Sequence, residues 1–298
     1  MFFDDASGRV ISNLGWVDGG RLWAFDVATD RESYLSVADA DGLSLERGRH
    51  GRFRMTEIEG QDRRISVRTF SEPLIELAAC QSSDANWILS GDMDAWADVP
   101  RTFFTNRGPP ALTVIKPEEG GVHVAPLGWF NESSYDLLYQ GLVDSLVLAS
   151  GQVLISVQRS SELLIVNELQ GHIVQRVSLG DRGGNPKLRR LSDGAIAASD
   201  YDTLCIIEPR RWQVRKSDIL QAPRPPMGAE FIGDYDIRGT DCIVARPFSG
   251  DVLRLDTSTL AVVDQAPIGG QPLSVCWLEG DEFLTRDWKT GKVRRGQF

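Results

Sequence analysis

The chain has 298 residues, of which 42% are hydrophobic and 25% are charged, and its formal net charge is −10. These proportions are typical of a folded globular protein and exclude a disordered or fibrous chain. The negative charge argues against DNA or RNA as a partner, because contacts with phosphate groups need clustered lysine and arginine. We therefore predict a folded protein that does not bind nucleic acid.

The start of the chain, MFFDDASGRV, has acidic residues where a secretory signal would have basic ones. No apolar run approaches the roughly 18 residues that a membrane span needs. The sequence thus predicts a cytoplasmic protein that is not bound to a membrane. The cysteines have no CxxC spacing, which favours buried free thiols over disulfides or metal ligands; they are Cys80, Cys205, Cys242 and Cys276.

Short β-type segments separated by tight turns recur along the chain. The clearest group lies in residues 142–180, where turn residues separate four segments rich in β-branched and aliphatic residues: DSLVLA, QVLISV, LLIVNE and IVQRVSL. Turn residues taken to follow the first strand of each group recur at similar steps: Gly19 to Gly60 is 41, Gly151 to Gly194 is 43, and Asp241 to Asp281 is 40. A period of about 40–45 residues with four strands per unit is typical of β-propellers.

Seven such units fit the chain. The first is assigned RVISNLGWV, RLWAFDV, SYLSVADA and LSLERG; the third is irregular, with DAWADVP as a helical turn; and the last has only PLSVCWL, EFLTRDW and KVRRGQF. We expect MFFDD to supply the missing fourth strand, so that pairing of the two termini in one blade closes the ring and removes exposed strand edges. The predicted fold is all-β, a single domain over residues 1–298 that forms a seven-bladed β-propeller of four-stranded antiparallel blades.

The second half of the chain resembles the YVTN-type repeats of seven-bladed propellers. The shared pattern is G-x-x-P before an inner strand, D-G or G-D at the first turn, and a T-x-x-V or T-G-x-V turn late in the unit, as in residues 257–260 and 290–293. The resemblance covers about residues 142–298. It implies a fold and no single activity, because that superfamily includes lactonases, lyases, quinoprotein dehydrogenases and binding scaffolds. The Gly-His and Trp-Asp signature of WD40 repeats is absent.

Charged residues recur where the second strand of each predicted unit ends, beside the central channel of a propeller. Alignment of the units by their first turn gives Asp26, Arg68, Arg159, Asp200, Arg246 and the run Arg286, Asp287 and Trp288. Arginine suits carboxylates or phosphates, and an aspartate whose pKa is shifted by burial can act as an acid or base. Two interpretations stay open: a small polar, anionic ligand at the channel mouth, or charges that neutralise one another in a water-filled channel.

Roles can be assigned to these residues if the channel mouth is a pocket. Hydrolase, lyase or isomerase chemistry would depend on Asp200, Asp287 and Tyr201 as catalytic groups. The ligand-binding candidates are Asp26, Arg68, Arg159, Arg246, Arg286 and Trp288. We expect a small-molecule ligand in preference to a protein partner. The alternative is a protein-interaction scaffold without catalytic activity.

Two acidic segments, residues 199–202 and 233–236, offer the carboxylates that Ca²⁺ or Mg²⁺ bind: Asp200, Asp202, Asp234 and Asp236. Their spacing is not that of an EF-hand loop, and turn-forming aspartates explain them equally well. We therefore predict no metal site, and a divalent cation there is the less favoured interpretation. The histidines do not assemble into a site; they are His50, His123 and His172.

Overall fold

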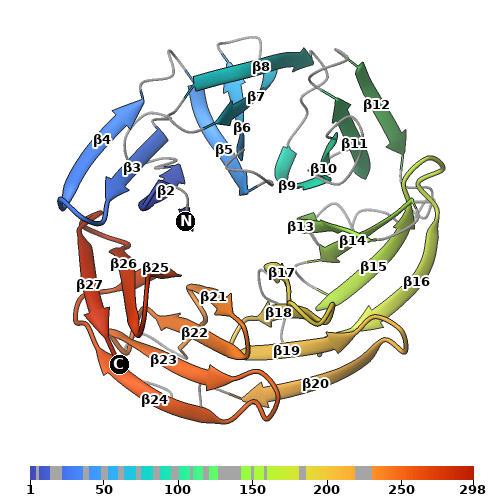
Figure 1. Cartoon of the computed structure of the whole chain (residues 1–298). Coiled ribbons are helices and arrows are strands. Elements are labelled where there is room, and N and C mark those ends of the chain that lie inside the picture. Colours follow the sequence, from blue (N-terminus) through green and yellow to red (C-terminus); the bar gives the residue numbers. More distant parts are fainter. Residues whose placement is uncertain are drawn as a thin grey trace. The chain divides into compact units, whose positions relative to one another are not determined.

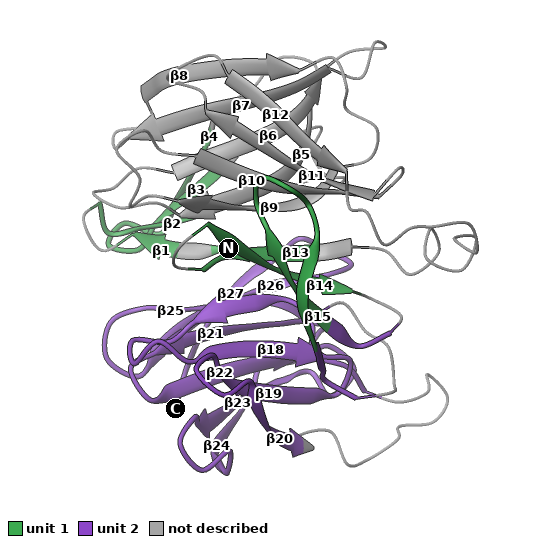
Figure 2. Cartoon of the chain, turned by 90° about the vertical axis from the view of Figure 1, so that its right-hand side faces the viewer, with its two compact units in different colours: residues 1–157, 163–176 green, residues 158–162, 177–298 purple. Residues whose placement is uncertain are grey.

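The computed structural model of the chain describes residues 1–4, 7–13, 22–35, 40–47, 53–59, 64–71, 75–82, 88–94, 101–107, 110–116, 121–126, 142–148, 151–157, 160–180, 186–218 and 230–298. Within these ranges, side chains are described for residues 1, 3–4, 7–12, 23–34, 144–148, 151–157, 160–180, 186–217 and 230–298. The chain divides into two compact units (Figure 2). Unit 1 comprises residues 1–157 and 163–176, and unit 2 comprises residues 158–162 and 177–298.

Antiparallel β-sheets make up the secondary structure of the described residues (Figure 1). Six of their sheets have four strands and one has three. In each sheet, strands that are adjacent in sequence are also hydrogen-bonded neighbours, as expected for β-strands joined by short turns. The described ranges contain no helix long and apolar enough to cross a membrane. The cytoplasmic location stays a prediction.

The first three sheets follow one another along the chain. The first consists of β1 (Phe2–Asp4), β2 (Arg9–Asn13), β3 (Leu22–Asp26) and β4 (Arg31–Leu35). The second consists of β5 (Ala40–Arg47), β6 (Phe53–Glu59), β7 (Arg64–Ser71) and β8 (Ile75–Ser82). The third consists of β9 (Ile88–Asp94), β10 (Arg101–Arg107), β11 (Pro110–Lys116) and β12 (Gly121–Pro126). The third unit is therefore regular in its strands. Of DAWADVP, the predicted helical turn, Asp94 ends β9 and residues 95–100 lie outside the described residues.

The remaining sheets match the strand segments predicted for units four to seven. The fourth sheet consists of β13 (Leu142–Val147), β14 (Gln152–Val157), β15 (Glu162–Asn167) and β16 (Ile173–Ser178). The fifth consists of β17 (Leu188–Arg190), β18 (Ile196–Asp200), β19 (Thr203–Glu208) and β20 (Gln213–Asp218). The sixth consists of β21 (Asp234–Arg238), β22 (Asp241–Arg246), β23 (Asp251–Asp256) and β24 (Val262–Pro267). The last consists of β25 (Pro272–Trp277), β26 (Glu282–Asp287) and β27 (Val293–Gln297).

The N-terminal strand completes the first sheet, which corrects the predicted pairing of the two termini. β1 pairs with β2, and Asp4 lies opposite Arg9. A tight turn joins the two strands: Gly8 has a φ of 65° and donates its N–H to the carbonyl oxygen of Asp4 at 3.0 Å, and the Ser7 hydroxyl donates to the Asp4 carboxylate at 2.6 Å. Because a short loop costs little closure entropy, this local hairpin is favoured over pairing between the ends of the chain.

The strand positions predicted for the first two units are wrong by one strand. In sequence, Gly19 falls between β2 and β3 and Gly60 falls between β6 and β7, both outside the described residues, whereas the later marker turns lie between first and second strands. Every hairpin of a four-stranded sheet needs a turn, so glycine and aspartate mark turns without numbering the strands. As a result, Asp26 ends the third strand of its sheet, and Arg68 lies in the third strand of the next.

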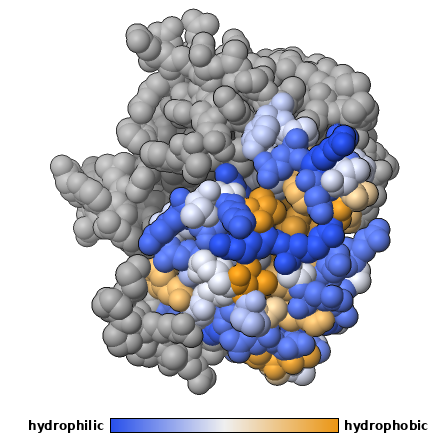
Figure 3. Space-filling model, turned by 90° about the vertical axis from the view of Figure 1, so that its left-hand side faces the viewer, coloured by the Kyte–Doolittle hydropathy of each residue, from blue (hydrophilic) through white to orange (hydrophobic). Residues whose placement is uncertain are grey.

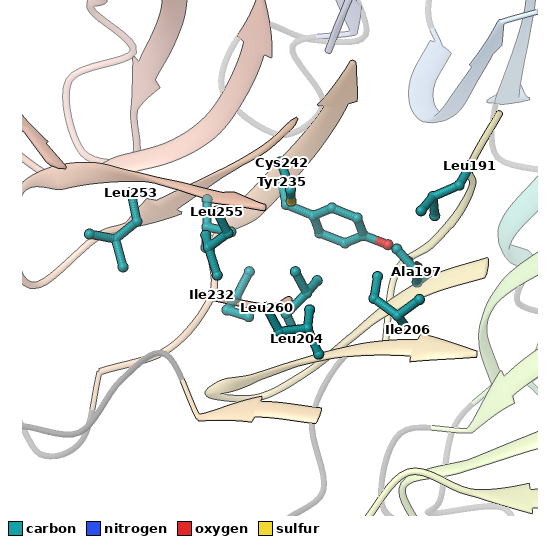
Figure 4. Close-up of a cluster of buried hydrophobic side chains, with 11 residues drawn as sticks. Leu191, Ala197, Leu204, Ile206, Ile232, Tyr235, Cys242, Leu253, Leu255 and Leu260 are labelled. Atoms are coloured by element: carbon teal, nitrogen blue, oxygen red, sulfur yellow. Dashed lines mark hydrogen bonds between the residues drawn. The ribbon is translucent and has the colours of Figure 1, made fainter. Parts of the chain in front are cut away.

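One core cluster of unit 2 is formed by apolar side chains of the fifth and sixth sheets and of the segments beside their strands (Figure 4). Its buried members are Leu191, Ala197, Leu204, Ile206, Ile232, Tyr235, Cys242, Val244, Leu253, Leu255 and Leu260. Tyr235, on β21, points its hydroxyl toward the fifth sheet, where it lies 2.7 Å from the carbonyl oxygen of Lys187 and 2.9 Å from that of Ala197. The buried phenol therefore has hydrogen-bond partners, and it ties the two sheets together.

Three of the four cysteines are buried free thiols, as predicted. They are Cys205, Cys242 and Cys276, and burial raises the pKa of the last two. A thiol that stays protonated is a poor nucleophile and a poor metal ligand. Cys80 lies in β8, and its side chain is outside the described set.

Candidate functional site

Three successive sheets of unit 2 end their second strands in turns that present aromatic side chains. β18 ends before Tyr201, β22 ends two residues before Phe248, and β26 ends before Trp288. A fourth aromatic residue, Phe231, lies in the segment that leads into β21. We call these four residues the aromatic surface.

Phe231 is the centre of the aromatic surface. Its ring centroid lies 6.4 Å from that of Tyr201, 5.4 Å from that of Phe248 and 6.2 Å from that of Trp288. The contacts with Phe248 and Trp288 are edge-to-face, a geometry that contributes about 0.5–1.5 kcal/mol beyond the area buried. Trp288 is nevertheless 50% exposed and Tyr201 is 39% exposed. Two large aromatic side chains thus lie half in solvent while packed around a third.

Buried polar groups fix the backbone beneath the aromatic surface. The buried carboxylate of Glu230 accepts the N–H groups of Phe248 and Ser249, which ties the turn after β22 to the segment that contains Phe231. The carbonyl oxygen of Tyr201 accepts the N–H of Ile232 at 2.8 Å. The positions of the rings therefore follow from hydrogen bonds between neighbouring turns as well as from ring contacts.

Asp287, a predicted catalytic residue, forms the turn that presents Trp288. Its Oδ1 accepts the N–H of Lys289 at 3.0 Å and the N–H and hydroxyl of Thr290, both at 2.9 Å. Its Oδ2 accepts the N–H of Gln271 at 2.8 Å and Nη1 of Arg294 at 3.1 Å. Burial alone would raise the pKa of Asp287, but these hydrogen bonds and Arg294 hold that pKa well below its ordinary value of 3.8. The carboxylate is ionised at neutral pH and is therefore not suited to donate a proton.

The backbone at Gly270 lies close to the side chains of Asp287 and Arg294. Gly270 has a φ of 68°, in the left-handed region that favours glycine. A Cβ atom at this position would also overlap the Asp287 carboxylate and the Arg294 guanidinium. The glycine is thus needed both for its backbone conformation and for the space it leaves to the ion pair.

Arg246, a predicted ligand-binding residue, pairs with a carboxylate of its own hairpin. Arg246 and Asp251 are opposite each other on β22 and β23. Nε of Arg246 donates to Oδ1 of Asp251 at 2.7 Å, and Nη2 donates to Oδ2. The side chain of Arg246 is 15% exposed and that of Asp251 is 4% exposed. The planar fork of this arginine therefore binds a protein carboxylate, as the charge-neutralisation interpretation expects.

Arg286 also contacts its own hairpin, because its Nε donates to the carbonyl oxygen of Gly291 at 3.3 Å. Asp200, the second catalytic candidate, is buried, and its Oδ1 accepts the hydroxyl of Ser161 at 3.0 Å. Tyr201, the third, has its ring in the aromatic surface. The structure thus brings together Tyr201 and Trp288 among the predicted site residues, and the charged ones whose side chains it describes have partners within the protein.

The carboxylates considered as metal ligands have separate partners. Nζ of Lys187 lies 3.1 Å from Oδ1 of Asp234, and although burial would raise the pKa of Asp234, Lys187 and Arg189 lower it. Burial raises the pKa of Asp236, whose Oδ2 accepts the N–H of Trp277 at 2.9 Å. Oδ1 of Asp202 lies 3.1 Å from the neighbouring Thr203 hydroxyl. Among the described residues, no three His, Cys, Asp or Glu groups are placed to hold a metal ion.

Asp26 belongs to unit 1 and forms a turn of the same type as Asp287. Its Oδ1 accepts the N–H groups of Ala28 and Thr29 at 3.1 and 2.9 Å. Hydrogen bonds from Thr29 are the main reason that the pKa of Asp26 is lowered. Asp26 therefore stabilises the turn that follows β3.

Two other predicted residues lie where no side-chain geometry is described. Arg68 lies in β7 with its side chain outside the described set, and Arg159 lies outside the described residues. Of the histidines, His172 is exposed between β15 and β16, His123 lies in β12, and His50 is outside the described residues. The ligand-binding roles of Arg68 and Arg159 stay predictions.

Comparison with solved structures identifies the fold of the chain. No protein-family model matches the sequence, and no curated protein sequence matches it. Among solved structures, the chain is similar to the β-propeller domain of Cps50 (Swd1) from Myceliophteria thermophila, with a TM-score of 0.73 and 12% sequence identity, over 99% of this chain and 95% of that one. The chain is a β-propeller. The predicted all-β fold with four-stranded antiparallel sheets is thus confirmed, whereas the blade number and the YVTN type of its repeats stay predictions.

The expectation that this propeller prefers a small-molecule ligand to a protein partner is wrong. The finding that overturns it is the similarity of this chain to the β-propeller domain of Cps50 (Swd1). The contacts explain why the sequence was misleading. Arg246 and Asp287 are charged residues at strand ends, yet their partners are groups of their own hairpins and of a neighbouring segment of the chain. A charged residue at a strand end is therefore no evidence of a ligand when the next strand of the same sheet supplies the counter-charge.

Four contributors to the site were missed from the sequence: Phe231, Phe248, Glu230 and Asp251. A signal existed for Phe248, because an aromatic residue follows within two positions of the second-strand end in three successive units of this propeller. Phe231 follows a proline-rich stretch and has no such regular position. The burial of Glu230 and Asp251 depends on neighbouring turns, which composition does not show.

Proposed function

We propose that this propeller is a protein-interaction scaffold and that a partner protein docks on the aromatic surface. The observation that supports this proposal is the half-exposed pair Trp288 and Tyr201, held around Phe231 by ring contacts and by the hydrogen bonds of their turns. Tryptophan and tyrosine dominate the binding energy of protein interfaces, because they bury a large area and have few rotatable bonds to immobilise. A partner that covers these rings removes their apolar area from water, which stabilises the complex.

The paired charges at the strand ends support the same proposal. Asp287 and Arg246 stabilise the two turns on which Trp288 and Phe248 lie. On the side that Figure 3 shows, the hydrophobic residues of the described part form areas among hydrophilic ones. Single exposed apolar residues are normal on protein surfaces, whereas a rigid aromatic group calls for an explanation.

We further propose that residues 1–298 form one domain and that each sheet is one blade of a seven-bladed ring with YVTN-type repeats. The strand order within each sheet supports this arrangement, and so does the step of 40 residues between Asp241 and Asp281. A ring of sheets is suited to a scaffold, since its turns are presented on a rigid frame.

Replacing Trp288 with alanine should weaken partner binding by about 30-fold, the loss that a hot-spot residue of roughly 2 kcal/mol gives. The measurement compares proteins recovered with the wild-type chain, with Trp288→Ala and with Tyr201→Ala, followed by titration of each recovered protein against the purified variants. Val263→Ala is the matched control, because Val263 is exposed on β24 and lies outside the aromatic surface. Partners that bind Trp288→Ala and Tyr201→Ala as tightly as the wild type would overturn the proposal.

A further inference from the structure

The acidic residues around the aromatic surface are buried. At the strand ends and turns of this part of unit 2, the exposed fractions of the described acidic residues lie between 2% and 6%; these residues are Asp200, Asp202, Glu230, Asp234, Asp251 and Asp287. Hydrogen bonds from backbone amides, hydroxyl groups or cationic side chains satisfy them. Little of their negative charge is therefore available to a molecule that approaches from solvent.

The cations of the same region are more exposed. Lys289 and Lys292 are exposed on the turn that presents Trp288. The side chains of Lys187 and Arg294 are 38% and 28% exposed, although each is paired with a buried aspartate. Among the described residues of this part of unit 2, the positive groups are therefore more exposed than the negative ones, even though the net charge of the whole chain is −10.

Screening by salt limits the distance over which the charges of the chain act on a bound partner. At physiological ionic strength the screening length is about 8 Å, so charges on remote parts of the chain contribute little at the aromatic surface. Lys289 is adjacent to Trp288 in sequence, and Lys292 is in the same turn. Charges close to the aromatic surface therefore contribute more to the interaction with a partner than the net charge of the chain does.

We propose that the partner segment is an acidic peptide with an aromatic or large aliphatic anchor residue. The anchor packs against Trp288 and Phe231, and flanking aspartate or glutamate side chains lie near Lys289 and Lys292. This inference rests on the proposed function, because it specifies the chemistry of the partner at the same surface. A basic segment would find the carboxylates of this surface buried and would meet the two lysines unfavourably.

Peptide binding to the full chain tests this inference. Three fluorescein-labelled peptides of about twelve residues share a central tryptophan and differ in their flanks, which alternate serine with glutamate, with further serine, or with lysine. Fluorescence anisotropy is measured at roughly 50 and 300 mM salt. We expect the glutamate peptide to bind about three- to tenfold more tightly than the serine peptide, with a difference that shrinks at high salt, and the lysine peptide to bind most weakly.

Variants of the chain separate the contributions of charge and of the aromatic anchor. The double variant Lys289→Glu with Lys292→Glu should reverse the preference between glutamate and lysine peptides, whereas Trp288→Ala should weaken all three peptides. Arg211→Glu is the matched charge reversal at an exposed position between β19 and β20, and it should leave the preference unchanged. Equal binding of the three peptides, lost in Trp288→Ala, would overturn the acidic partner and leave the scaffold proposal standing. No binding by any peptide at about 1 mM would contradict both.

Discussion

Arg246→Ala should lower the free energy of unfolding by about 3–5 kcal/mol. The substitution leaves the carboxylate of Asp251 buried without its bidentate partner, so that, among the described residues, Gln265 remains as its side-chain donor. Removal of one member of a buried ion pair is costly because the remaining charge has lost both water and counter-charge. Chemical denaturation of the purified wild type and variant measures the difference.

Two further variants identify the cause of that loss. Arg246→Ala combined with Asp251→Ala removes both charges and should be clearly more stable than Arg246→Ala alone. Arg246→Lys keeps the charge without the planar fork and should fall between the wild type and Arg246→Ala. A stable Arg246→Ala protein would contradict the structural role of the pair and would return Arg246 to the set of ligand-binding candidates.

Asp287→Asn should lower the free energy of unfolding by about 2–4 kcal/mol at neutral pH, because hydrogen bonds to a charged acceptor are worth more than those to a neutral one. The asparagine keeps one acceptor oxygen. Its NH₂ group is itself a donor and cannot accept the hydrogen bonds that the other carboxylate oxygen accepts from donors such as Gln271, Thr290 or Arg294. Trp288 follows directly in sequence, so the same variant should also weaken partner binding. Asp264→Asn, an exposed change on β24, is the matched control and should have little effect on either measurement.

The stability difference between the wild type and Asp287→Asn should depend on pH. The folded-state pKa of Asp287 lies below its ordinary value of 3.8, so ionised Asp287 stabilises the folded state fully above that value. As the pH falls through the lowered folded-state pKa, the carboxylate becomes protonated and this contribution is lost. Thermal melting between about pH 7 and pH 2 should show the two proteins converge below about pH 4. A difference that stays constant over this range would contradict the role of the ionised carboxylate.

The second half of the fold was predictable because its turns are regular. Gly151, Gly194 and Gly280 all have positive φ and all lie between a first and a second strand, so the repeat and the strand positions agree. In the first half the marker residues Gly19 and Gly60 fall between second and third strands, so the predicted strand positions were wrong by one. The pairing of β1 with β2 was also missed, because the tight turn at Gly8 resembles any other glycine turn in sequence.

The site was predictable only in part. Tyr201 and Trp288 were identified from their places at strand ends, and the structure joins them through Phe231. The pairing of Arg246 with Asp251 depends on hairpin register, which the spacing of charged residues did not reveal. Burial of the acidic residues, which leaves Lys289 and Lys292 as the exposed charges beside Trp288, depends on neighbouring turns and appears only in three dimensions.

Cross-linking from position 288 tests the central claim most directly. In the variant Trp288→p-benzoylphenylalanine, an aromatic photo-crosslinker replaces the most exposed ring of the aromatic surface, and Val263→p-benzoylphenylalanine places the same group on β24. We predict that irradiation of the complex links position 288, and not position 263, to a partner segment that contains aspartate or glutamate beside an apolar residue. A complex that forms normally and yields no cross-link from position 288, or yields the same cross-links from both positions, would contradict the account.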